Sequence, residues 1–138
     1  MHRLSQTYFD HDADIGIIGR GDTLEGCLES AARATFAVMI DPSRVELQRE
    51  VQVEFEEADP EFALVAWLNG LLAAAREEGL ALGRFRLRRR GDHWSGTAWG
   101  RPWSRDEDRG TEVKGATLTM LSVTQSDGEW EARCVVDV

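Results

Sequence analysis

The acidic segment Asp10-His11-Asp12-Ala13-Asp14, near the start of the chain, has side chains suited to binding a cation. In an extended segment alternate residues point to the same side, so its three aspartates would gather on one side. Two carboxylates in close contact near a protein surface repel each other by about 4 kcal/mol, and a hard cation such as Ca²⁺ or Mg²⁺ relieves this repulsion. A solvated acidic turn, in which Asp14 caps backbone N–H groups, is the alternative.

The spacing of these aspartates does not fit the calcium loop of an EF-hand. When that loop is numbered from Asp10, Ile15 falls where the loop needs a glycine. Gly21 falls where the loop needs its bidentate glutamate. An EF-hand is therefore excluded.

The C-terminus offers a second set of oxygen ligands. Asp137 and the carboxylate of Val138 follow an apolar stretch, 132–136, that is typical of a strand. A terminal strand should end at the rim of its sheet, where Asp137 can join an oxygen site formed mainly by the first strand. An ordinary exposed chain end explains the same residues equally well.

Arginines recur at every second position in 84–90 and form a third candidate feature: Arg84, Arg86, Arg88 and Arg90. Like charges on one side of a strand repel, so they need acidic neighbours across the sheet, a bound phosphate or an acidic partner surface. Since the chain has 25 Asp and Glu residues, we expect pairing within the protein.

Common catalytic and metal-binding motifs are absent from the sequence. It has no P-loop, no dinucleotide-binding glycine motif, no GxSxG and no HExxH. Cys27 and Cys134 form no CxxC and lie among apolar residues, so we interpret them as small core side chains and do not expect a zinc site.

The charge balance narrows the possible partners. The 138 residues carry 25 acidic and 16 basic side chains, a formal charge of −9 that repels nucleic acid, so no direct nucleic-acid binding is expected. No apolar stretch approaches 18 residues, and the first ten residues lack the apolar core of a signal peptide. These features predict a soluble cytoplasmic protein without membrane contact.

Local signals predict the elements that position the candidate residues. Residues 7–20 suit extended structure, and a helix follows whose cap we expect to be Asp22. The helix should stop near Ile40, because Asp41 precedes Pro42 and is disfavoured in the helical region.

A second helix and several strands complete the predicted fold. Residues 51–56 alternate as a strand does, and a helix is predicted over Pro60–Glu78, capped by Asp59 and ended by Gly79. A hairpin turning at Gly91-Asp92 and two final strands, 112–126 and 130–137, follow. We expect one α+β domain over residues 1–138, with two helices covering one face of a mostly antiparallel β-sheet.

Several motifs, spread over nearly the whole chain, together resemble one known family, the archeases. They are His11-Asp12-Ala13-Asp14-Ile15-Gly16-Ile17, Thr23-Leu24-Glu25, Met39-Ile40-Asp41-Pro42, Trp67-Leu68-Asn69, Glu112-Val113-Lys114 and Val135-Val136-Asp137-Val138. The first and last motifs are the specific ones. The family pattern has threonine at Asp12, and commonly Thr-Tyr-His at Thr117-Leu118-Thr119.

The resemblance implies an accessory protein of the GTP-dependent RtcB-type RNA ligase, which acts in tRNA splicing and RNA repair. Archeases promote guanylylation of this ligase and so allow multiple turnover. The resemblance further implies a divalent metal, Ca²⁺ or Mn²⁺/Mg²⁺, held by Asp14, Asp137 and the main-chain carbonyl of Val138, with Asp12 as a further candidate. It assigns Lys114 and His11 to partner binding.

Two other functions fit the residues. A small metal-dependent hydrolase could use the same acidic cluster to activate water on a phosphoester, although no well-placed general base accompanies the cluster. The other alternative is a binding or chaperone-like domain without a metal.

Overall fold

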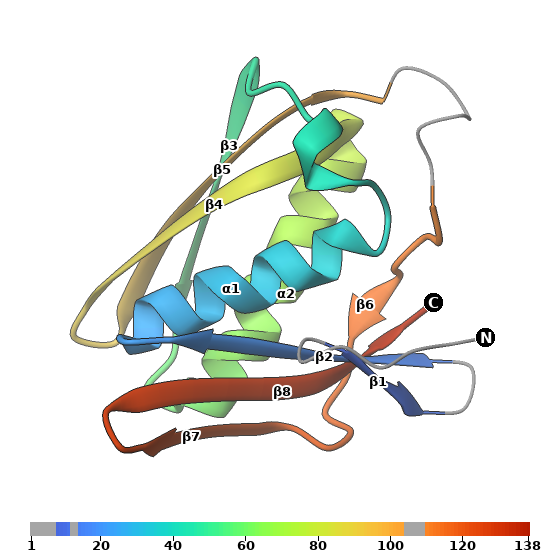
Figure 1. Ribbon diagram of the computed structural model, residues 1–138. Coiled ribbons are helices and arrows are strands. Elements are labelled where there is room, and N and C mark those ends of the chain that lie inside the picture. The colour runs from blue at the N-terminus through green and yellow to red at the C-terminus, as the bar shows by residue number, and fades with distance from the viewer. Residues whose placement is uncertain (1–7, 12–13, 104–109) are drawn as a thin grey trace.

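The computed structural model describes residues 8–11, 14–103 and 110–138, which form an α+β fold (Figure 1). Two helices, α1 (Leu24–Ala37) and α2 (Pro60–Glu78), pack against antiparallel strands. The expected class, with two helices and mostly antiparallel strands, is confirmed. The strands are divided between two sheets, where we expected one.

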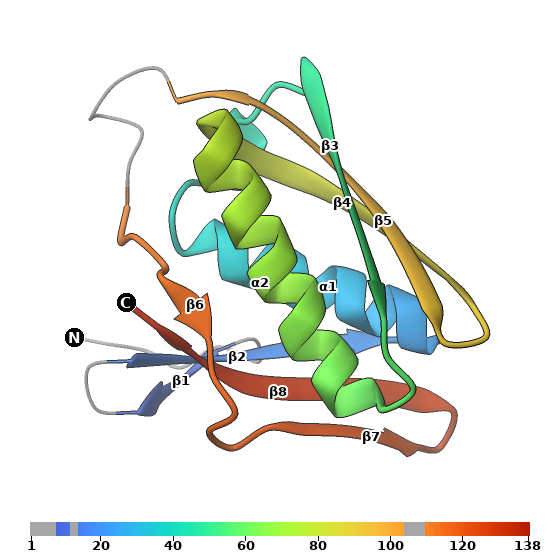
Figure 2. The ribbon, with the colours of Figure 1, turned by 180° about the vertical axis from the view of Figure 1, so that it is seen from behind.

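The first sheet brings the two ends of the chain together. Its strands are β1 (Tyr8–His11), β2 (Asp14–Gly21), β8 (Glu129–Asp137), β7 (Ser122–Ser126) and β6 (Gly115–Ala116). The central strand β8 pairs with β2 on one side and with β7 and β6 on the other. Strand β2, which begins at Asp14, and strand β8, which ends at Asp137, lie side by side in both ribbon views (Figures 1 and 2).

The second sheet has three strands in the order β3 (Arg49–Glu56), β5 (His93–Pro102) and β4 (Leu80–Arg90). The hairpin between β4 and β5 turns at Gly91, whose φ of 60° lies in the left-handed region. Helix α1 packs against both β2 and β4, so it lies between the two sheets. A short 3-10 helix, η1 (Pro42–Arg44), follows α1.

The stretch predicted to be extended, 7–20, contains two strands, β1 and β2, which pair with each other in antiparallel fashion. The strand predicted over 112–126 is interrupted between β6 and β7. There the N–H and hydroxyl of Thr117 both donate to the carbonyl of Val135, and Met120 adopts a φ of 54°, which no strand accommodates.

The helix ends are set by local capping. The prediction that Asp22 caps α1 was wrong, because the Oγ1 of Thr23 accepts the N–H of Gly26 and Thr23 itself is extended. For α2 the prediction is confirmed: Asp59 accepts N–H groups of the first turn, and Gly79 ends the helix with a φ of 68°.

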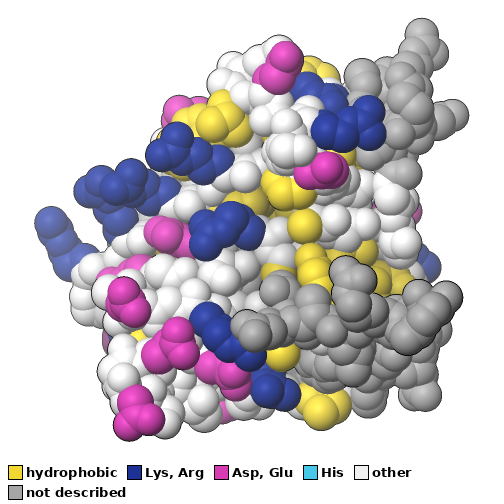
Figure 3. Space-filling view, viewed as in Figure 1, with side chains coloured by type: hydrophobic (Ala, Val, Ile, Leu, Met, Phe, Trp, Pro, Cys, Tyr) yellow, Lys and Arg dark blue, Asp and Glu magenta, His cyan; other side chains and the backbone are white. Residues whose placement is uncertain are grey.

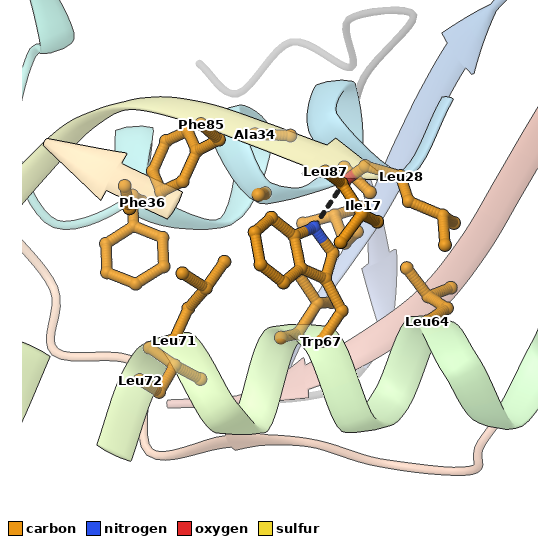
Figure 4. Packing of buried hydrophobic residues seen from close by; sticks show 14 of the residues in the cluster. Ile17, Leu28, Ala34, Phe36, Leu64, Trp67, Leu71, Leu72, Phe85 and Leu87 are labelled. Atoms are coloured by element: carbon orange, nitrogen blue, oxygen red, sulfur yellow. Dashed lines mark hydrogen bonds between the residues drawn. The ribbon is translucent and has the colours of Figure 1, made fainter. Parts of the chain in front are cut away.

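Trp67 of α2 lies in the centre of the core between the two sheets (Figure 4). Its side chain is fully buried, and its Nε1–H donates to the carbonyl of Leu28 at 3.0 Å. Cys27 and Cys134 are free and buried, as predicted, and burial raises the pKa of each thiol to about 12. None of the described helices is long and apolar enough to cross a membrane.

Candidate functional site

The register of the first sheet brings Asp14 and Asp137 next to each other. Strands β2 and β8 are antiparallel, and Ile15 pairs with Val136. The next residues toward the rim, Asp14 and Asp137, therefore lie opposite each other on neighbouring strands. Two aspartates from opposite ends of the sequence are thus neighbours at one end of the sheet.

The same level of the sheet extends across four strands. On one side, the backbone of His11 on β1 pairs with Asp14 on β2. On the other side, Gly115 on β6 pairs with Asp137 on β8. Because successive residues alternate between faces and Val136 is buried in the core, Asp137 faces away from the helices. Asp14 is half-buried and Asp137 is exposed.

Lys114 lies beside Asp137 because helix α2 holds the short strand β6 in place. The N–H of Lys114 donates to the carbonyl of Asp137 at 2.7 Å. Asn69 of α2 donates to the carbonyl of Ala116 and accepts its N–H, and Arg76 donates to the carbonyl of Lys114. The positioning roles of Asn69 and Arg76 were not predicted from the sequence, where the only signal was the resemblance over Trp67-Leu68-Asn69, which does not reach Arg76.

The charged side chains at this end of the sheet are not neutralised by described neighbours. Asp14, Asp137 and Lys114 make no side-chain hydrogen bond or ion pair with any residue that the structure describes. Val138 follows Asp137 and packs partly against the core, which fixes the main chain at the end of β8. The arrangement therefore holds two unpaired carboxylates beside an ordered main chain.

This donor set has the chemistry of a site for a hard cation. Carboxylate and carbonyl oxygens are the ligands preferred by Ca²⁺ and Mg²⁺. Within 8–11, 14–103 and 110–138, no three or more His, Cys, Asp or Glu side chains gather closely enough to hold a metal by themselves. A cation held by Asp14 and Asp137 would therefore need main-chain or water oxygens as well. Asp12 lies outside the described residues, as does the side chain of His11.

The segment that departs from the family pattern continues from β6. Thr117 is anchored to Val135, as described above, whereas the apolar side chain of Leu118 is 62% exposed. Thr119 donates its N–H to the hydroxyl of Thr117, which tightens the turn.

The predicted pairing of the four arginines with acidic side chains was wrong within the part of the chain that the structure describes. Arg84, Arg86, Arg88 and Arg90 are all exposed on one face of β4, as expected. Arg84 lies over the ring of Trp99, 5.7 Å from its centroid. Arg86, Arg88 and Arg90 have no ion pair among the described residues, because the strand next to β4 in the sheet carries no carboxylate on this face.

Comparison with known proteins gives a consistent result over nearly the whole chain. Residues 7–138 match the model of the Archease protein family. The chain is 37% identical over 134 residues to a protein archease of Sulfolobus acidocaldarius, covering 95% of this chain and 96% of that protein. It is 35% identical over 135 residues to a protein archease of Methanothermobacter thermautotrophicus, with 95% and 96% covered.

Two solved structures have a similar fold. The solution structure of a Methanobacterium thermoautotrophicum protein superimposes with a TM-score of 0.80 at 33% identity, over 96% of this chain and 97% of that one. The crystal structure of a Thermotoga maritima archease, described as a possible chaperone, gives a TM-score of 0.68 at 21% identity. It covers 99% of this chain and 100% of that one.

Proposed function

The chain belongs to the archease family, and we propose that it is a cytoplasmic accessory protein of a GTP-dependent RtcB-type RNA ligase. In this role it promotes guanylylation of the ligase and allows it to turn over repeatedly in tRNA splicing or RNA repair. The protein itself is not the catalyst. Its negative charge is compatible with this role, because the ligase supplies the basic surface that holds the RNA.

The observation that carries the proposal is the position of Asp14 opposite Asp137 at the rim of the first sheet. The two carboxylates and the main-chain carbonyl of Val138 would hold Ca²⁺, Mn²⁺ or Mg²⁺. When bound, such an ion supplies positive charge that can bind and orient phosphate oxygens. Without an ion the two carboxylates repel each other, so cation binding is favoured at this rim.

Lys114 supplies the second charged contact of the proposed site. It directly precedes β6 and its N–H donates to the carbonyl of Asp137, and its side chain has no carboxylate partner among the residues described. An ammonium group on a flexible stem can contact a phosphate or an acidic group of the ligase. His11, whose backbone pairs with Asp14, is the other residue proposed to face the partner.

Ligase turnover tests the proposal directly. A purified RtcB-type ligase at limiting concentration receives RNA with a terminal phosphate, GTP and this protein. We expect the wild-type protein to raise the number of ligations per ligase molecule, and Asp14→Asn or Asp137→Asn to lose most of that effect. The matched control is Asp127→Asn, because Asp127 lies in the turn at the other end of β8.

Two results would overturn the proposal. The first is equal ligase turnover with and without the protein. The second is metal-dependent hydrolysis of a phosphoester by the protein alone that is lost in Asp14→Asn, because the same cluster would then be an active site. Calorimetric titration of Ca²⁺, Mn²⁺ and Mg²⁺ into wild type and the two variants tests the metal separately. We expect a site in wild type that is weakened about tenfold or more by either substitution.

A further inference from the structure

The outer face of the second sheet carries two parallel rows of opposite charge. The face is built at four levels, because the register aligns one residue from each strand at each level. The levels are Glu56-His93-Arg90, Glu54-Ser95-Arg88, Gln52-Thr97-Arg86 and Glu50-Trp99-Arg84. All members of the β3 and β4 rows are exposed, and the members of the β5 row are half-buried. Figure 3 shows Lys and Arg side chains gathered over β4.

The two rows do not neutralise each other within one molecule. They stand on strands separated by β5, so their backbones are about 10 Å apart. Among the described residues no arginine of the β4 row forms an ion pair with a glutamate of the β3 row. Glu54 and Glu56 instead contact the imidazole of His93 in the central row. The arginine row is therefore free to meet carboxylates from another molecule.

We propose that this face binds a second copy of the same chain, with the arginine row of each copy against the glutamate row of the other. A hollow between the rows is lined by both signs, with Glu54, Arg88, Arg90 and His93 on its walls. A polyanion would meet the repulsive glutamate row as well as the arginines, because both rows lie on the same face. A surface of the same mixed pattern has no such conflict.

Only one arrangement of two copies satisfies both rows. If the twofold axis runs parallel to β5 between the facing sheets, β4 of each copy lies over β3 of the other at the same level. Arg90 then faces Glu56 of the second copy, and Arg88 faces its Glu54. A twofold axis that runs between the facing sheets and across the strands would place the arginine row of one copy over the arginine row of the other. The charge pattern therefore selects one symmetric dimer.

The contact area predicts a weak dimer. Three strands about 4.8 Å apart and four levels about 6.8 Å apart give about 400 Å² per copy. Stable complexes bury about 800 Å² per partner, so this interface belongs to the transient class. Ion pairs at its surface are screened by salt, and the dimer should therefore weaken as salt rises above about 0.1 M.

Sedimentation equilibrium with charge reversals tests the proposal. The wild-type protein in about 0.1 M salt should show a weight-average mass that rises above 15.5 kDa with concentration. Arg88→Glu and Glu54→Arg should each weaken self-association about tenfold or more, because each places like charges together at two symmetric contacts. An equimolar mixture of these two variants should associate again, since every contact in the mixed pair joins opposite charges.

Matched reversals elsewhere serve as controls. Arg33→Glu on the exposed side of α1 and Glu129→Arg in the β7–β8 hairpin change the net charge equally but lie off this face. They should leave self-association unchanged, and thermal melts verify that each variant folds. A wild-type protein that stays monomeric up to millimolar concentration overturns the proposal. So does a failure of the mixed variants to associate, or a monomer that binds single-stranded RNA through Arg88.

Discussion

The indole ring of Trp67 occupies the space that a side chain at position 96 would need. A Cβ added to Gly96 would lie 2.1 Å from Cζ3 of Trp67 and 2.6 Å from its Cη2. Trp67 is fully buried and its Nε1–H donates to the carbonyl of Leu28, so the ring cannot move away without losing this hydrogen bond and its packing. The glycine on the inner face of β5 and the tryptophan on α2 therefore set the distance between helix and sheet.

Gly96→Ala should destabilise the protein by about 3 kcal/mol or more, because the added methyl group overlaps a rigid buried ring. Urea denaturation followed by tryptophan fluorescence measures the loss. In a Trp67→Phe background, which removes the overlapping atoms, the same substitution should cost clearly less. Equal costs in both backgrounds would show that Trp67 is not the obstacle.

Thr23 and Asp22, the observed and the predicted N-cap of α1, should differ in their effect on stability. Thr23→Ala should destabilise the protein by about 1 kcal/mol, because it removes the acceptor of the Gly26 N–H at 2.9 Å. Asp22→Ala should cost less than about 0.5 kcal/mol, as is usual for an exposed residue without such a contact. Denaturation midpoints of the two variants compare them directly, and a larger loss for Asp22→Ala would contradict the assignment.

Asn69 should matter for the order of strand β6. Asn69→Ala removes both hydrogen bonds to the backbone of Ala116, so the amide protons of Ala116 and Lys114 should exchange with solvent faster than in wild type. The global stability should fall by only about 1 kcal/mol, because the contact is exposed. Hydrogen exchange measured by NMR tests this, with Glu77→Ala on the same helix as control. Unchanged exchange at both amides would exclude the positioning role.

His93 provides a prediction for pH. Its hydrogen bond to Glu56 raises the pKa of the imidazole above the ordinary 6.5, and Glu54 adds to the effect. The protonated imidazole therefore stabilises the folded protein. This stabilisation is fully present below the ordinary pKa of histidine, provided that the two glutamates are ionised, and it is lost as the pH rises through the raised pKa. NMR titration should therefore give a pKa above 6.5 in wild type. Glu56→Gln should lower it, whereas Glu50→Gln on the same strand should not.

Signals within a few residues of one another were sufficient for the helices and turns. Asp59, Pro60 and Gly79 fixed α2 to the residue, because a cap, a proline at the first turn and a left-handed glycine act locally. The turn at Gly91 was predicted for the same reason. Even the error at Asp22 was a displacement by one residue, since two adjacent side chains can both accept at a helix start.

Neither the division into two sheets nor the meeting of Asp14 with Asp137 was determined by the sequence pattern alone. Alternation shows which face of a strand is apolar, but not which strand lies beside it, because pairing depends on contacts between distant segments. That Asp14 lies opposite Asp137 follows only from the register between β2 and β8. The position of Lys114 follows from the hydrogen bonds between Asn69 and β6. Local chemistry thus supplied the charged residues, and tertiary packing decided which of them became neighbours.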